Sequence, residues 1–164
     1  MVCLLFCEQE TGMIKGNDPD DRGDPFDLNR FISAQEGIYD RVLSEVRGGL
    51  KRTHWMWFIF PQIDGLGHSP TTRHYAIKSL EEARRFLIHP VLGTRLVESA
   101  EAVLVVQERS ASDIFGHPDD WKLQSSMTLF ALVAEPGSVF ERVLDKYFQG
   151  KRDARTLQIV GNLS

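Results

Sequence analysis

Prolines and helix-capping residues divide this chain into short segments, and most of the segments carry the apolar spacing of an amphipathic helix. Seven prolines occur in 164 residues. Proline is favoured at the first position of a helix but breaks a helix from within, because it lacks the N–H and clashes with the preceding turn. The pattern therefore predicts many short helices rather than a few long ones.

The first helical signal follows Asp24-Pro25, where Asp can cap a helix and Pro can open it. Apolar residues then recur at spacings of three and four from Leu28 to Val46, with a break expected at Gly37. Further signals are prolines and the predicted caps Ser69, Ser79, Ser110 and Asp153. They predict helices over residues 54–60, from 70, 80–88, 90–104, 110–116, 119–133, 139–148 and 153–160. Residues 54–60 also fit a buried strand, but no partner strand is evident.

These segments predict an all-α fold in which residues 24–164 form one domain of about seven or eight helices. Because the helices differ in length and prolines recur between them, a compact array is expected rather than a regular bundle.

Residues 1–23 differ from the rest and are expected to form a flexible leader. Both cysteines, Cys3 and Cys7, lie there, so a disulfide framework is not expected and a reducing cytoplasm is the simpler inference. The apolar opening is too short for a signal peptide or a membrane span. Met13 offers a second start, and residues 1–12 are expected to be dispensable.

Composition narrows the functional classes. The chain is 42% hydrophobic and 26% charged, which is ordinary for a soluble protein. Its net charge of −4 supplies no basic surplus for phosphate neutralisation, so no nucleic-acid partner is expected. No membrane partner is expected either.

The stretch from Thr53 to Tyr75 combines aromatic rings with histidines, glycines and hydroxyl groups. Aromatic rings supply flat stacking faces, and histidine and arginine supply donors near neutral pH. The mixture favours a ligand pocket, and the alternative is a core aromatic helix followed by a surface loop. The candidate ligand-binding residues are Trp55, Trp57, Gln62, Gly65, Gly67, His68, Ser69, Thr72 and Arg73.

Within this stretch the loop 62–69 precedes a predicted helix start, which suggests an anion site. Gly65 and Gly67 allow close approach of the backbone, and N–H groups near Thr72 are free at a helix start. Arg73 would hold a phosphate or carboxylate. The loop lacks the preceding strand and the later glycine and lysine of a dinucleotide or P-loop motif, so a generic tight turn is the alternative.

Helix 119–133 is the most apolar, and Trp121 is expected in the core. Lys122, Ser125 and Ser126 fall on one stripe of it. A lysine close to a serine hydroxyl is one route to an activated nucleophile, so Lys122 and Ser126, with His68, are the catalytic candidates. The alternative is a solvated lysine with serines that bond back to helix carbonyls.

Metal chemistry finds no support, because the five histidines show no ligand spacing and both cysteines lie in the leader. No metal and no cofactor is expected. A pair of carboxylates stays open, but the sequence brings no two together among Asp64, Asp113, Asp119 and Asp120.

Four stretches together resemble an uncharacterised bacterial all-helical family, a domain of unknown function. They are HWMWFIFPQIDGLGHSPTTRHYAI, EARRFLIHPVLGTRLVES, DIFGHPDDWKLQSSMTLFALV and FQGKRDARTLQIV. Some members carry the label calpastatin, which we regard as a misannotation. The resemblance implies an all-α fold and no established activity. The chain also has a fainter, general similarity to helical proteins that process ADP-ribose derivatives. Their catalytic residues match no positions in this sequence, so none are assigned from that similarity.

Two functional hypotheses follow. The first is a cytoplasmic domain that binds, or binds and hydrolyses, a small phosphorylated or nucleotide-like molecule such as an ADP-ribose derivative, so that a small anionic ligand is the expected partner. The second is a non-catalytic interaction or structural module. They differ in whether His68, Arg73 and Lys122 converge on one concave surface.

Overall fold

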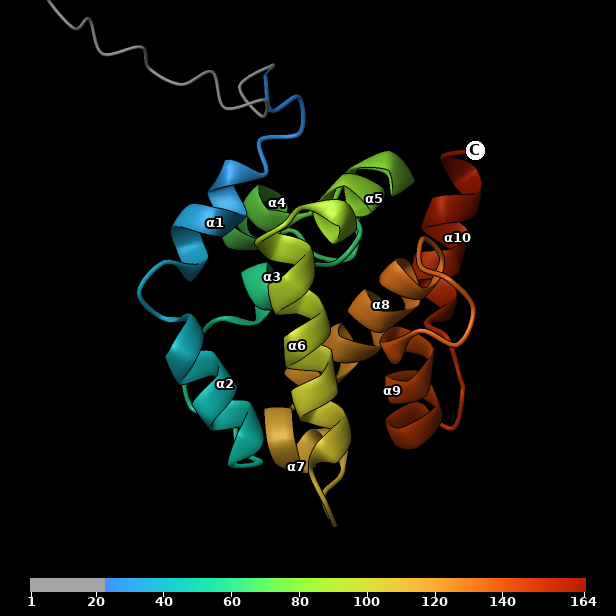
Figure 1. Cartoon of the computed structure of the whole chain (residues 1–164). Coiled ribbons are helices and arrows are strands. Elements are labelled where there is room, and N and C mark those ends of the chain that lie inside the picture. Colours follow the sequence, from blue (N-terminus) through green and yellow to red (C-terminus); the bar gives the residue numbers. More distant parts are fainter. Residues whose placement is uncertain (1–22) are drawn as a thin grey trace, which may run out of the picture.

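Ten helices make up the secondary structure of residues 23–164, the part of the chain that the computed structural model describes (Figure 1). They are α1 (Asn29–Gln35), α2 (Tyr39–Arg47), α3 (Met56–Ile59), α4 (Pro70–Tyr75), α5 (Leu80–Ile88), α6 (Leu92–Val105), α7 (Ala111–Phe115), α8 (Asp119–Ala131), α9 (Val139–Phe148) and α10 (Ala154–Asn162). No strand occurs in these residues, so the all-α, single-domain prediction is confirmed. The predicted leader, with both cysteines and Met13, lies outside the described residues apart from Gly23.

All ten helices fall in segments where the sequence predicted a helix, and the count of seven or eight was low because three of these segments are separate helices of little more than one turn. Segments α3, α4 and α7 contain four, six and five residues. The predicted break at Gly37 is present, and its φ of 73° separates α1 from α2. The helix expected from Pro25 begins later, at Asn29, because the Asp24 side chain fixes a turn by accepting bonds from the Phe26 and Asn29 N–H groups.

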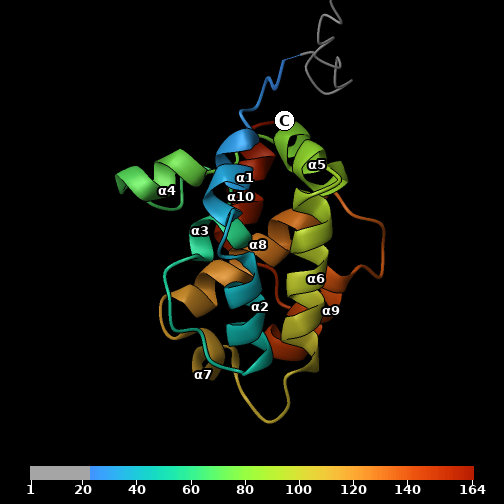
Figure 2. The same ribbon diagram turned by 60° about the vertical axis from the view of Figure 1, so that its left-hand side comes forward.

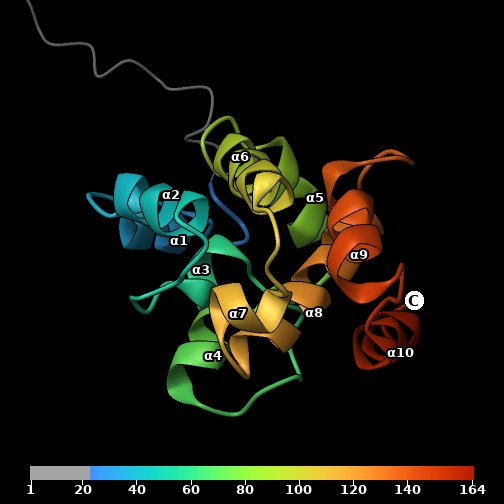
Figure 3. The same ribbon diagram turned by 90° about the horizontal axis from the view of Figure 1, so that it is seen from below.

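Helix α6 lies between α2 and α9, and α8 crosses behind it (Figure 1). Seen from below, α1 and α2 lie on one side of α6, and α9 and α10 lie on the other (Figure 3). Aromatic rings connect these layers: Phe31 is 5.0 Å from Phe86, Phe86 is 5.4 Å from Phe130, and Phe130 is 5.7 Å from Phe140, between ring centroids. This series of buried rings joins α1, α5, α8 and α9 into one core.

A buried ion pair fixes the start of the fold against α4 and α5. The Arg30 guanidinium lies 2.7 Å from the Glu82 carboxylate, with side-chain exposures of 9% and 1%. Arg30 also donates to the carbonyls of His74 and Ala76, at the end of α4. The second Glu82 oxygen accepts the Lys78 N–H. Each of these buried charges therefore has partners. The hydrogen bonds of Arg30 and Glu82 hold the backbone that follows α4, and so fix where that helix ends.

A second carboxylate, Glu45 on α2, organises the approach to α3. It accepts the N–H groups of Arg52 and Thr53, the Thr53 hydroxyl and the indole N–H of Trp55. Burial opposes ionisation of Glu45, but these four bonds outweigh it and hold its pKa at about 2.

The prediction that Trp121 belongs to the core is wrong. Its side chain is 63% exposed and packs edge-on against His117, with ring centroids 4.2 Å apart. Most of α8 is apolar around its circumference, so the sequence marks no single buried face. The face that enters the core carries Leu123, Met127 and Phe130 instead.

Helix α4 stands out from the body of the protein at one edge (Figure 2). None of its residues is buried. Among residues 23–164, no helix combines the length and the apolar character needed to cross a membrane.

Candidate functional site

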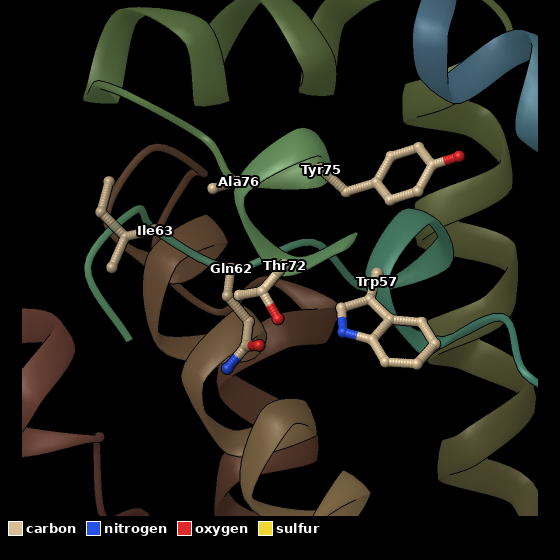
Figure 4. A pocket seen from close by; sticks show the side chains of 6 residues that line it. All are labelled: Trp57, Gln62, Ile63, Thr72, Tyr75 and Ala76. Carbon is tan, nitrogen blue, oxygen red and sulfur yellow. The ribbon is translucent and has the colours of Figure 1, made fainter. Parts of the chain in front are cut away.

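The stretch predicted to carry a ligand pocket forms a small hollow, with a volume of about 10 Å³. Helix α3, the loop after it and helix α4 build its walls (Figure 4). Its lining residues are Trp57, Gln62, Ile63, Thr72, Tyr75 and Ala76. A volume of about 10 Å³ accommodates roughly one water-sized group, so the hollow would hold a single polar group of a ligand and not a whole nucleotide.

Backbone hydrogen bonds hold the segment after α3 next to the segment after α4. The N–H of Ile77 donates to the carbonyl oxygen of Gln62 at 2.8 Å, and the N–H of Asp64 donates to the carbonyl oxygen of Ile77 at the same distance. They form the parallel bridge between Ile63 and Ile77. Gly67 is required beyond this bridge, because a Cβ there would lie 2.7 Å from the Thr72 methyl carbon. A larger residue at position 67 would therefore displace the Thr72 side chain.

Trp57 gives the hollow its most unusual group. Its indole nitrogen is buried and has no hydrogen-bond acceptor anywhere in residues 23–164. Figure 4 shows that nitrogen on the edge of the ring turned toward Thr72 and Gln62. A buried donor without an acceptor costs about 1–3 kcal/mol, so an acceptor supplied by a ligand would recover free energy.

Lys122 of α8 covers the ring of the same tryptophan, with its ammonium nitrogen 4.6 Å from the ring centroid. The ammonium also donates to Asp119 at 2.9 Å, and Lys51 reaches the same carboxylate at 2.7 Å. Burial raises the pKa of Asp119, but the bonds from Lys51 and Lys122 outweigh it and lower that pKa. Two cations around one carboxylate leave a net positive charge next to the hollow.

Two polar side chains complete the lining. The side-chain amide of Gln62 makes no hydrogen bond with the described part of the chain, so its donor and acceptor are both available. The Thr72 hydroxyl is 2.8 Å from that of Ser69, and the Ser69 hydroxyl accepts the Thr72 N–H. Ser69 is therefore the cap of α4, as predicted, and it orients Thr72.

The structure thus brings together part of the predicted binding set: Trp57, Gln62 and Thr72, with Lys122 beside them. Trp55 is 1% exposed and its indole N–H is bonded to Glu45, so it offers no stacking face. His68, Ser69 and Arg73 are exposed and do not line the hollow. Gly65 faces Ile159 of α10 instead. The expected convergence of His68, Arg73 and Lys122 on one concavity is therefore absent from the lining of the hollow.

The proposed Lys–Ser chemistry lacks the necessary geometry. Ser126 is fully buried, and its hydroxyl has no partner among the described residues, Lys122 included. The Lys122 ammonium is bonded to Asp119 and lies over the Trp57 ring, so neither of these contacts directs it to Ser126. Ser125 donates to the Trp121 carbonyl, as in the alternative interpretation.

The four loop aspartates bind separate partners rather than each other. Asp64 pairs with Lys78, and Asp113 accepts the N–H of Ser110, the N-cap of α7. Asp119 binds the two lysines, and Asp120 accepts from Ser112 and contacts His117. Within residues 23–164 no group of three or more histidine, cysteine or acidic side chains is placed to hold a metal ion.

Two features of the region were not anticipated from the sequence. Lys51 precedes the candidate stretch, yet its side chain reaches Asp119 across the fold and is only 7% exposed. His117 lies 3.1 Å from Asp120 through its Nδ1 atom, which leaves Nε2 facing away from that carboxylate. The contact of Lys51 with Asp119 depends on long-range packing, so no local sequence pattern indicates it. The contact of His117 with Asp120 could have been found, because the two residues are three apart in the sequence.

Comparison with known proteins identifies the group to which this protein belongs. Residues 25–160 match DUF1810, a family described as proteins of unknown function. The chain belongs to the DUF1810 family. A crystal structure of the conserved hypothetical protein Rv1873 from Mycobacterium tuberculosis is similar to it, with a TM-score of 0.82 and 51% sequence identity over 84% of this chain and 99% of that one. No curated protein matches. The predicted resemblance to an uncharacterised all-helical family is confirmed.

Proposed function

We propose that this protein binds a small phosphorylated or nucleotide-like molecule, such as an ADP-ribose derivative, with one polar group of the ligand in the Trp57 hollow. One observation carries the proposal: the buried indole N–H of Trp57 has no acceptor among the described residues, faces Gln62 and Thr72, and lies beneath the Lys122 ammonium. A ligand oxygen would accept from Trp57, and Lys122 would attract negative charge.

The proposal is limited to binding. Hydrolysis would need a base or nucleophile in the hollow, and neither Ser126 nor Lys122 is placed for that role. Arg73 lies one residue after Thr72 on the exposed α4, where it would reach a phosphate that extends out of the hollow. The protein is proposed to act in the cytoplasm, because the sequence has only two cysteines, both near its N-terminus, and so offers no disulfide framework.

A thermal-shift screen against ADP-ribose, AMP and ribose 5-phosphate tests the proposal. A ligand at one hundred times its Kd stabilises the folded state by about 2.7 kcal/mol. The best ligand is then titrated calorimetrically against Trp57→Phe, which keeps a ring but removes the N–H, and against Trp121→Phe as a control outside the hollow. Loss of one hydrogen bond, about 1 kcal/mol, weakens binding roughly fivefold in Trp57→Phe only.

Arg73→Ala extends the test to the exposed end of the ligand. Its side chain is exposed and makes no hydrogen bond or ion pair with described residues, so the melting temperature is expected to stay unchanged while affinity falls about tenfold. If no compound in the screen stabilises the protein, the alternative of a non-catalytic interaction or structural module is favoured.

A further inference from the structure

A buried lysine, Lys51, is bonded to the same carboxylate that holds Lys122. The Lys51 side chain is only 7% exposed, and its ammonium nitrogen lies 2.7 Å from one oxygen of Asp119. The Lys122 ammonium, which lies over the Trp57 ring, is 2.9 Å from the other oxygen of Asp119. Lys51 does not line the hollow, so a ligand there makes no contact with it. Lys51 can act on that ligand only through Asp119 and through its own charge.

The sharing of Asp119 decides how much positive charge Lys122 keeps for a ligand. Burial opposes ionisation of Asp119, but the bonds from Lys51 and Lys122 lower its pKa, so the carboxylate is charged near neutral pH. If Lys122 were the only partner of Asp119, the pair would be neutral overall and would attract an anion weakly. Because Lys51 also binds Asp119, the three groups together carry one net positive charge.

A second carboxylate, Glu45, lies on the Lys51 side of this group. The Lys51 ammonium is 5.2 Å from the centroid of the Trp55 ring, and the indole N–H of that ring donates to Glu45. No ion pair joins Glu45 to Lys51 within the described part of the chain, and hydrogen bonds hold Glu45 against the 52–55 segment. Glu45 is therefore a fixed background, and removal of Lys51 still changes the charge beside Asp119 by one full unit.

We infer that Lys51 gives the Trp57 hollow its preference for an anionic ligand, by compensating Asp119 so that the charge of Lys122 is left for the ligand. The inference rests on the proposed function and adds the residue that selects the charge of the ligand. Lys51 is a positioning residue in this scheme, because it acts through Asp119 and Lys122. A buried charge is screened by salt and water much less than an exposed one, so its effect reaches a ligand that it does not touch.

The test measures, by calorimetry on the full-length protein, the binding of AMP and of adenosine, which differ by the phosphate alone. Lys51→Met removes the charge and keeps a long side chain, and the backbone bond from the Lys51 N–H to the Ile114 carbonyl is retained. At low ionic strength this variant is expected to bind AMP roughly fivefold more weakly and adenosine as well as the parent does. Lys51→Arg keeps the charge and is expected to bind AMP within about twofold of the parent. A distorted site would weaken both compounds, so adenosine separates charge from structure.

Lys151→Met is the matched control, because it removes one exposed lysine charge outside the hollow and should leave both affinities unchanged. Unchanged AMP affinity in Lys51→Met, or equal losses of AMP and adenosine, would overturn the inference and leave nucleotide binding at the Trp57 hollow in place. A parent protein that binds neither compound would instead overturn the proposed function, and the inference with it.

Discussion

Two glycine-to-alanine changes on helices should have opposite effects on stability. Gly93 is the second residue of α6, and a Cβ there would lie 1.8 Å from the Leu87 carbonyl oxygen of α5. Gly161 lies in α10, and a Cβ there would meet no atom within 4 Å. Since both positions are helical, the intrinsic preference for alanine favours both substitutions by up to about 1 kcal/mol.

The contact at Gly93 reverses that preference. The obstructing atom belongs to the backbone of α5, so no side-chain rotation relieves the overlap and the corner between α5 and α6 must open. Overpacking of this kind costs about 1–3 kcal/mol, and a backbone obstacle places it at the upper end. After the helical gain is subtracted, Gly93→Ala is expected to lose about 2 kcal/mol and Gly161→Ala to gain about 0.5 kcal/mol.

Urea titrations of the parent and both variants measure the difference. In melts, a loss of 2 kcal/mol corresponds to a fall of about 4–8 °C for a protein of this size. If Gly93→Ala is as stable as Gly161→Ala, the close approach of α6 to the end of α5 is not the reason for glycine at position 93.

Three further predictions concern single side chains. Trp121→Ala should change the free energy of unfolding by less than about 1 kcal/mol in a denaturant titration, because the ring is mostly exposed. Arg30→Lys should cost about 2–4 kcal/mol by the same assay, since one ammonium cannot replace a guanidinium bonded to Glu82 and several carbonyls. The pKa of Glu45 is about 2 in the folded protein, below its ordinary value of 4.5, so its stabilisation is complete above about pH 4.5 and is lost as the pH falls toward 2. Urea midpoints measured from pH 6 to pH 2.5 should fall less steeply for Glu45→Gln than for the parent, and parallel curves would contradict this assignment.

Local signals in the sequence account for most of the fold. The serine and aspartate caps Ser69, Ser79, Ser110 and Asp153 all accept N–H bonds at the helix starts where they were expected. These predictions succeed because a cap and its partner are three residues apart. The prediction that Trp121 is buried failed because α8 is apolar on nearly every side. Which side is buried depends on the packing of α5, α7, α9 and α10 against it.

The sequence predicted where in the chain a hollow would form, but not which side chains would line it. The composition of residues 53–75 predicted a pocket, and a small hollow occurs there, yet Trp55 and Trp57, two residues apart, lie in different surroundings. Glu45 draws Trp55 into the core, and Lys122 lies over Trp57. Both partners are distant in sequence or on another helix, so no local pattern distinguishes the two rings.

The most direct test of the central claim is a titration of the ¹⁵N-labelled protein with ADP-ribose, followed through the indole N–H signals. An acceptor in the hollow would give the Trp57 N–H the hydrogen bond that it lacks within residues 23–164, and a new bond moves its proton signal downfield. The account predicts a saturable downfield shift of Trp57 that is lost in Lys122→Gln, with Trp121 unmoved. An unmoved Trp57 signal at saturating ADP-ribose, or an equal response from the exposed Trp121, would contradict it.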